Sequence, residues 1–207
     1  MSVLGAVVIA GLLGFMFLRS QATTENAAAG KLAQAEIMFW QGYYARAYDM
    51  AQLVVKQYPR AQSGLEAHRV AGDAAYWRGE PGDFQKAADE YRTYLQHGSS
   101  SLVAQGVRRS LAYALESDGG ARQARGDAAG AASDFREAAA TYDGLVGVFA
   151  DRESSAEFLY AAARCDRQLG QTEEAVKRLK RLLDEYGETT TANRARITLA
   201  EITAGAR

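Results

Sequence analysis

Few side chains in this sequence could support catalysis or bind a metal, and they are isolated from one another. His68 and His97 are the only histidines, and neither is followed by a metal-ligating residue three or four positions later. Cys165 is the only cysteine, so it can form neither an internal disulfide nor a metal cluster by itself, and its alanine-rich surroundings predict a buried thiol. No glycine-rich phosphate loop follows a strand pattern. We therefore expect no catalytic residues, no metal ligands, no cofactor and no enzymatic activity.

Charge and composition narrow the function classes further. The 207 residues carry 24 Lys and Arg against 25 Asp and Glu, which leaves no basic excess for nucleic acid. The adjacent acids Asp89 with Glu90 and Glu173 with Glu174 are expected on solvated helix surfaces. Only two prolines occur and alanine is abundant, which favours helices over strands. The composition therefore predicts an all-α protein that does not bind nucleic acid.

The first eighteen residues, MSVLGAVVIAGLLGFMFL, contain no charged side chain. As a helix they would be about 27 Å long, slightly less than a hydrocarbon core of about 30 Å, so they can span a bilayer that thins locally. The alternative is a secretory signal peptide that is cleaved near Ser20-Gln21-Ala22. The lack of Lys or Arg before the apolar run favours an uncleaved transmembrane anchor at residues 1–18, followed by a polar tether at 19–30.

Within the expected anchor, Ala6, Ala10 and Gly14 are spaced by four residues and would align on one helix face. Such a stripe permits close packing against another transmembrane helix, although small residues are also common in these helices for other reasons. Arg19 and Lys31 follow the apolar run and weakly favour a cytoplasmic C-terminal domain, but large domains are often translocated regardless of that bias.

A turn with glycine followed five residues later by alanine occurs four times. The copies are GYYARA (42–47), GDFQKA (82–87), GDAAGA (126–131) and GQTEEA (170–175). Glycine ends a helix in the left-handed conformation at little cost, and the small alanine lets the two helices of a hairpin cross closely. Four residues after these alanines stand Ala51, Tyr91, Phe135 and Leu179, which indicates one apolar helix face. The pattern predicts four helical hairpins.

These features resemble the tetratricopeptide repeat family. The small residues of the first helices are Ala35, Gly72, Ala112 and Ala163, the turn aromatics are Tyr44 and Phe84, and Pro59 closes the first repeat. The second repeat carries the insertion Glu80-Pro81-Gly82 and the third a longer one around SDGGARQAR (117–125), so the third should have long helices or a protruding loop. In the fourth, Thr172 replaces the aromatic and Gly187 the proline.

The resemblance implies a right-handed superhelix of antiparallel helix hairpins over residues 31–207. The expected repeats are 31–60, 63–98, 102–149 and 154–187, with a capping helix at 191–204. In this family the first helices form a concave wall that commonly binds polypeptide. Aromatic residues beside arginines suit such a wall, although several of the aromatics could instead pack between repeats. The candidate residues are Glu36, Phe39, Trp40, Arg69, Asp73, Tyr76, Trp77, Arg109, Tyr113, Glu116, Tyr160, Arg164 and Arg167.

The predicted function is a membrane-anchored scaffold for protein-protein interaction, acting as an accessory or assembly subunit of a membrane protein complex. The alternative is a periplasmic chaperone-like protein that binds transient clients, similar to the repeat-containing ancillary subunit of the Sec translocon. Both imply a single span in a bacterial inner membrane and proteins as partners. The resemblance to the Sec subunit implies a periplasmic repeat domain, whereas the charge bias after the apolar run favours the cytoplasmic side. An enzyme that uses the repeats to shape a hydrolytic or transferase site lacks an identifiable catalytic group.

Overall fold

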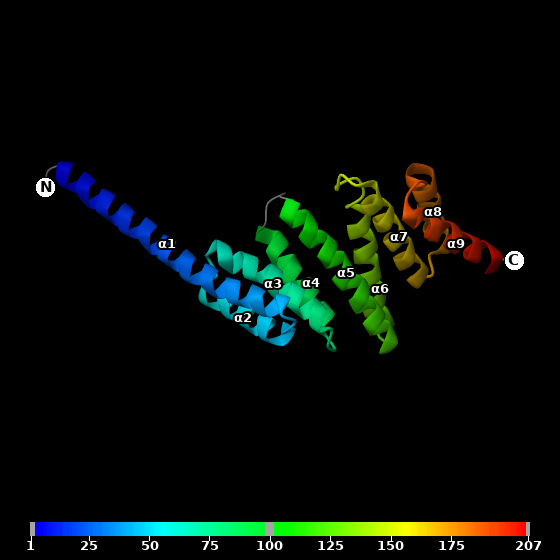
Figure 1. Cartoon of the computed structure of the whole chain (residues 1–207), viewed down its shortest axis with the longest axis horizontal. Helices are drawn as coiled ribbons and strands as arrows, with labels where there is room; N and C mark the ends of the chain where they lie inside the picture. The colour runs from blue at the N-terminus through cyan, green and yellow to red at the C-terminus, as the bar shows by residue number, and fades with distance from the viewer. Residues whose placement is uncertain (1–2, 98–101, 206–207) are drawn as a thin grey trace. The chain divides into compact units, whose positions relative to one another are not determined.

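The computed structural model describes the backbone of residues 3–97 and 102–205, and the side chains of residues 16, 18–97 and 102–204. Over these residues the secondary structure is α-helical, with no strand (Figure 1). The all-α prediction is confirmed for this part of the chain. The helices are α1 Val3–Trp40, α2 Tyr44–Gln57, α3 Gln62–Arg78, α4 Asp83–His97, α5 Leu102–Ala124, α6 Ala128–Asp143, α7 Arg152–Gln168, α8 Thr172–Tyr186 and α9 Thr190–Gly205.

Within the described residues, no helix has an apolar stretch that meets the length and hydropathy required to cross a bilayer. The expected anchor at residues 1–18 coincides with the start of α1, whose backbone is described from Val3. The side chains of Ala6, Ala10 and Gly14 lie outside the described part, so their predicted packing role stays a prediction.

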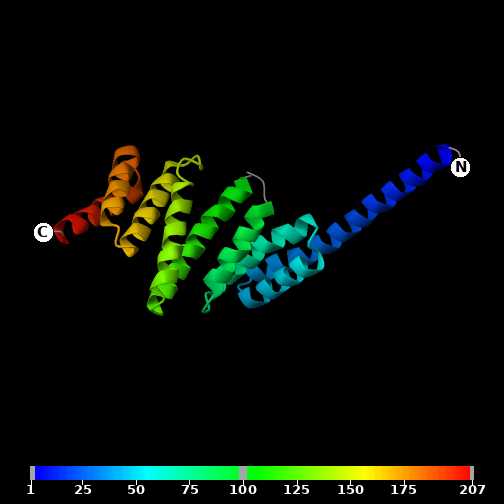
Figure 2. The ribbon, with the colours of Figure 1, turned by 180° about the vertical axis from the view of Figure 1, so that it is seen from behind.

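The chain divides into two compact units, residues 1–78 and 79–207. The first contains α1, α2 and α3, and each of these helices packs against the other two. Its core is formed by Ala28, Leu32, Ala35, Ala51, Val54, Ala67, Val70 and Ala71. The N-terminal part of α1 projects beyond α2 and α3 in both views (Figures 1 and 2). The boundary between the units falls inside the expected second repeat.

The second unit contains α4 to α9, in which each helix packs against its neighbour in the chain and α9 also packs against α7. Its C-terminal core includes Leu159 of α7, Leu179 and Leu182 of α8 and Ala195 of α9. The insertion expected in the third repeat lengthens α5 to 23 residues, which confirms the prediction of a long helix there.

The repeated turns have the predicted conformation. Gly42, Gly82, Gly126 and Gly170 have φ angles of 80°, 86°, 84° and 70°, in the left-handed region that glycine adopts without strain. The alanine five residues after each glycine is buried, as are Ala51, Tyr91, Phe135 and Leu179 one turn later. The predicted apolar face of the second helices is therefore confirmed.

An ion pair joins the two helices of each of the last two hairpins, with opposite polarity. In α5 and α6, Arg122 Nε lies 2.9 Å from Asp134 Oδ2. In α7 and α8, Asp166 pairs with Arg178. Arg122 and Asp166 both stand four residues before the turn glycine, and Asp134 and Arg178 both stand eight residues after it. The position before the turn glycine is therefore basic in α5 and acidic in α7, and its partner position is acidic in α6 and basic in α8.

A glutamate seventeen residues before the turn glycine caps the helix that follows the hairpin. Glu25 of α1 accepts hydrogen bonds from the backbone of Gln62 and Ser63 at 2.8 and 3.0 Å, at the start of α3. Glu153 of α7 accepts bonds from the backbone of Thr190 and Thr191 at 3.0 and 2.9 Å, and from both hydroxyls at 2.7 Å. These carboxylates satisfy amide groups that a helix N-terminus leaves unpaired.

The Glu153 cap makes the stability of the α7–α9 region depend on pH. Hydrogen bonds from Thr191 and then Thr190 lower the pKa of Glu153 from 4.5 to about 2. A lowered pKa in the folded state means that the ionised carboxylate contributes stability above about pH 4.5, and this contribution is lost as the pH falls towards 2. Glu153→Gln is expected to lower the free energy of unfolding by about 1 kcal/mol at pH 7 and to flatten its pH dependence in that window.

Urea denaturation followed by circular dichroism at several pH values tests this prediction. Glu201→Gln, at an exposed position of α9, is the matched control and should change neither quantity. Equal pH profiles for Glu153→Gln and the unmodified chain would show that the cap does not contribute.

Candidate protein-binding surface

In the first unit, three predicted groove residues form an ion-pair network. Arg69 Nη2 lies 3.1 Å from Glu36 Oε1, and the same guanidinium contacts Glu66 at 3.1 Å and Asp73 at 3.3 Å. Burial by itself would lower the pKa of Arg69, but the hydrogen bond to Glu66 and the nearby carboxylates outweigh it and raise that pKa. Arg69 therefore stays charged and already has carboxylate partners within the chain.

Five aromatic residues of α1, α2 and α3 form a second feature, which we call the aromatic cluster: Phe39, Trp40, Tyr44, Tyr76 and Trp77. Their rings make a chain of edge-on, tilted and stacked contacts with centroid separations between 5.4 and 6.3 Å. Trp40 and Trp77 are 83% and 61% exposed. Because exposed tryptophans are scarce on surfaces that bind nothing and are enriched among residues that dominate binding energy, this cluster is the strongest candidate for a binding surface.

In the second unit, the predicted residue Arg164 is held by Glu116. Its Nε and Nη2 donate to the two carboxylate oxygens at 2.5 and 2.8 Å, and the Tyr142 hydroxyl donates to the same carboxylate at 2.8 Å. The hydrogen bond to Glu116 raises the pKa of Arg164. Burial raises the pKa of Tyr142, so its phenol stays protonated. These groups link α5, α6 and α7.

Three of the remaining candidates of this unit neighbour the Glu116–Arg164 group, and the fourth, Arg109, contacts a different ring. Arg109 lies over the Phe149 ring at 5.6 Å, and Tyr113 contacts Tyr142 with a centroid separation of 5.9 Å. The Tyr160 ring is contacted by the guanidinium groups of Arg164 and Arg194, and its hydroxyl lies 3.1 Å from Thr198 Oγ1. Arg167 is exposed beside a depression of about 280 Å³ that Arg164 and Gln168 also line.

The structure thus brings Glu36, Arg69 and Asp73 together, and places Trp40 and Tyr76 in the aromatic cluster. It holds Arg164 in contact with Tyr160 and beside the same depression as Arg167, whereas Arg109 contacts Phe149. The binding roles of all these residues stay predictions. What the geometry adds is that Arg69 and Arg164 have carboxylate partners of their own, so an anionic ligand would have to displace them.

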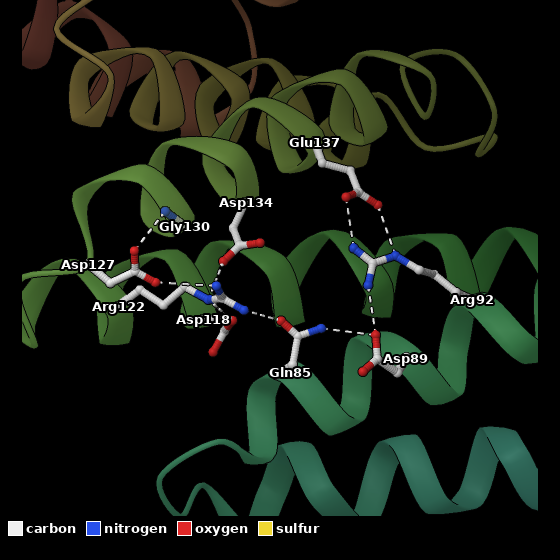
Figure 3. Close-up of polar contacts among 9 residues, drawn as sticks. All are labelled: Gln85, Asp89, Arg92, Asp118, Arg122, Asp127, Gly130, Asp134 and Glu137. Carbon is white, nitrogen blue, oxygen red and sulfur yellow. Dashed lines mark hydrogen bonds and ion pairs between the residues drawn. The ribbon is translucent and has the colours of Figure 1, made fainter.

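A polar network across α4, α5 and α6 was not anticipated from the sequence (Figure 3). Arg122 contacts Asp118 at 2.6 Å, Asp134 at 2.9 Å and Asp127 at 3.4 Å, and also donates to Gln85. Burial, opposed by Arg122 and reinforced by Asp118, raises the pKa of Asp134 to about 6. The network joins three helices and has no exposed tryptophan, so we interpret it as structural.

Figure 3 also shows a second group of ion pairs, in which Arg92 of α4 lies between Asp89 of its own helix and Glu137 of α6. Its Nε and Nη2 donate to Glu137 at 3.1 and 2.7 Å. The partners lie 45 residues apart, and the signal that could have identified them is the charge complementarity of successive second helices.

The described residues give little support for metal binding, for a reactive cysteine or for a ligand pocket beside Arg167. They contain no cluster of His, Cys, Asp or Glu suited to a metal ion. Cys165 is buried, as predicted, and burial raises the pKa of its thiol, which disfavours the reactive thiolate. The depression beside Arg167 is smaller than most ligand pockets, which start at about 300 Å³.

Comparisons with known proteins address the repeats directly. The family model described as tetratricopeptide repeat matches residues 157–189, which cover most of α7 and all of α8. A crystal structure of nearly identical TPR-like repeats, from a Podosopora anserina protein described as a kinesin light chain, superposes with a TM-score of 0.56 at 17% identity. The alignment covers 86% of each chain. The chain has the tetratricopeptide repeat fold.

No curated protein sequence matches the chain. The tetratricopeptide repeat fold generally serves as a scaffold for protein-protein interaction and is generally not catalytic. The fold therefore agrees with the predicted role as a scaffold for protein-protein interaction.

Proposed function

We propose that this chain is a membrane-anchored scaffold that holds another protein through the aromatic cluster, as an accessory or assembly subunit of a membrane protein complex. The observation that carries the proposal is the exposure of Trp40 and Trp77, which are connected through the rings of Phe39 and Tyr44 in the aromatic cluster. Two large exposed aromatic side chains give a partner apolar area at low conformational cost.

The surroundings of the cluster indicate a polypeptide partner. Glu36 and Asp73 lie one helical turn before Trp40 and Trp77, respectively, and both hold Arg69. Polar groups that border an aromatic centre are common at protein interfaces. Nothing in this arrangement resembles an enclosed small-molecule pocket.

Membrane attachment is part of the proposal because of the sequence of residues 1–18. Their lack of charge suits a single span, and a bacterial inner membrane with the repeats on the periplasmic side is the location that we propose. The partners would then be integral membrane subunits reached by the repeats that follow the anchor.

A second candidate function is a chaperone-like role in protein export, with transient clients. The same exposed tryptophans favour it, since aromatic surfaces also bind unfolded apolar segments. The two functions differ in stoichiometry. A subunit keeps one set of partners in fixed ratio, whereas a chaperone-like protein retains a broad set of substoichiometric clients.

Affinity purification from native membranes in mild detergent, with mass spectrometry, tests both. The variant Trp40→Ala with Trp77→Ala is expected to lose at least about tenfold of the bound partner, because buried tryptophans at interfaces often contribute 2 kcal/mol or more. Ile197→Ala, which alters an exposed apolar residue of α9, should retain it. Unchanged partner recovery in the double variant would contradict the role of the aromatic cluster. A chain lacking residues 1–18 shows whether the partner also needs the anchor.

A further inference from the structure

The outward face of α1 is free of charge. Between Ser20 and Gln41 the charged residues are Glu25, Lys31 and Glu36. All three reach towards α2 or α3 and their connecting loop: Glu25 caps α3, Lys31 donates to Gln57 and lies over Tyr58, and Glu36 pairs with Arg69. A surface helix ordinarily directs its charges to solvent, so this distribution is inverted.

Four residues on the outward face are Asn26, Gly30, Ala33 and Ile37, and all are exposed. Steps of three and four residues place them on one side of the helix. We call this set the outer face of α1. Ile37 is 56% exposed, although aliphatic side chains of this size are usually buried.

A comparison of α1 with α3 shows what such a face does elsewhere in the chain. The sequences Phe39-Trp40-Gln41-Gly42 and Tyr76-Trp77-Arg78-Gly79 end the two helices, and Gly42 and Gly79 both have positive φ angles. In this register Asn26, Gly30, Ala33 and Ile37 of α1 correspond to Ser63, Ala67, Val70 and Ala74 of α3.

All four counterparts on α3 are buried. Ala67 and Val70 pack in the core shared with α1 and α2, and Ser63 is bonded to Glu25. On α3, the corresponding face is covered by α1 and α2. The outer face of α1 is therefore a helix-stacking face of the same kind. Its occupant continues an interface that already exists within the first unit.

Gly30 adds an independent observation. A Cβ atom at this position would have no heavy atom of the described residues within 4 Å, so none of these residues requires a glycine in the middle of this helix. Glycine is disfavoured in helix interiors, and its usual benefit is the close approach of another backbone. That benefit exists only if a second helix lies on the outer face.

We propose that the outer face of α1 packs against the same face of a second copy of this chain. A neutral face meets its own copy without bringing like charges together, and the small Gly30 and Ala33 beside the larger Ile37 supply both groove and ridge. A two-fold pair uses one surface patch on both subunits. Stacking of the C-terminal helix on α1 fits less well, because the exposed side of α9 carries Arg196 and Glu201.

Cysteine cross-linking of the purified 207-residue chain tests this pairing. Ala33→Cys places a thiol on the outer face, and Ile197→Cys places one on α9, where the native side chain is 62% exposed. The buried Cys165 should react in neither. With diamide as the oxidant, Ala33→Cys is expected to form at least about tenfold more disulfide-linked dimer than Ile197→Cys under the same conditions.

The companion variant Ala33→Cys with Ile37→Asp places a charge on the outer face and should abolish the excess, while circular dichroism confirms that its helices are intact. Equal cross-linking at positions 33 and 197 would overturn the proposal, as would a dimer that persists with Asp at position 37. Cross-linking of Ala33→Cys in native membranes mainly to a different protein would also overturn it. The cross-link reports self-association alone, so the partner recovery described above can fail or succeed independently.

Discussion

Replacing Arg178 with methionine is expected to lower the free energy of unfolding by about 3 to 5 kcal/mol. Arg178 pairs with Asp166, which is only 2% exposed, and also donates to both carboxylate oxygens of Asp143 at 3.2 and 2.6 Å. Without the guanidinium, a buried carboxylate between α7 and α8 has lost its compensating charge. Urea denaturation at pH 7, followed by circular dichroism, measures the loss.

Two controls make this prediction specific. Arg181→Met removes an arginine of the same helix whose partner, Glu185, is exposed and lies one turn away, so it should cost less than about 1 kcal/mol. Asp166→Asn combined with Arg178→Met removes the buried charge and should recover part of the loss. A deficit in Arg178→Met no larger than that in Arg181→Met would contradict the expected role of the pair.

The acid dependence of Arg178→Met provides a second readout. Burial raises the pKa of Asp166 above its usual value even with Arg178 present. A raised pKa means that the folded state favours the protonated acid, so the deficit of the variant should shrink as the pH falls and Asp166 loses its charge.

The substitution Gly64→Ala is expected to lower the free energy of unfolding by about 3 kcal/mol, the upper end of the usual cost of overpacking. Its Cβ would lie 2.0 Å from the carbonyl oxygen of Tyr58 and 3.0 Å from the carbonyl carbon. Both atoms belong to the backbone between α2 and α3, so this loop would have to move before the methyl group could fit. Chemical denaturation is again the measurement.

Gly106→Ala is the matched control, since it adds the same methyl group to a position within α5 with open space around it. It should stabilise the fold by about 0.5 to 1 kcal/mol, because alanine restricts the unfolded chain and favours the helix. If Gly64→Ala were as stable as Gly106→Ala, the close contact with Tyr58 would not limit the residue at position 64.

The hairpins were predictable because their signals are local. A glycine such as Gly126 ends a helix because its own backbone can adopt a positive φ angle, and Ala131 is small because the two helices cross beside it. Both features can therefore be predicted from the local sequence alone. The long helix α5 was one of two alternatives, because the insertion joins the helix-disfavouring pair Gly119 and Gly120 to a helix-forming run at residues 121–125.

The environment of the candidate site was not predictable in the same way. Arg69 and Arg164 have the residue type and spacing of a binding wall, but each contacts a carboxylate that lies 33 or 48 residues earlier in the chain. Such pairs depend on how successive hairpins stack, which helical periodicity does not reveal. The exposed Trp40 is different, because it stands five residues after the buried Ala35, and a rotation of about 140° directs it away from the core.

The division after Arg78 also escaped prediction, for a local reason. Gly79 and Gly82 both have positive φ angles, but only Gly82 is followed five residues later by an alanine, so the sequence motif aligns on Gly82. Alignment on Gly82 predicts one hairpin over residues 63–98, whereas the structure assigns α3 to one unit and α4 to the other.

The opposite polarity of the ion pairs in the last two hairpins bears on how the chain avoids misassembly. If α5 met α8, Arg122 and Arg178 would occupy facing positions. If α7 met α6, Asp166 and Asp134 would do so. Repeat proteins are prone to exchange equivalent helices within or between chains, because their repeats look alike. In this protein each incorrect helix pairing brings two like charges into a poorly hydrated position. This repulsion disfavours exchange of helices between the last two hairpins during folding.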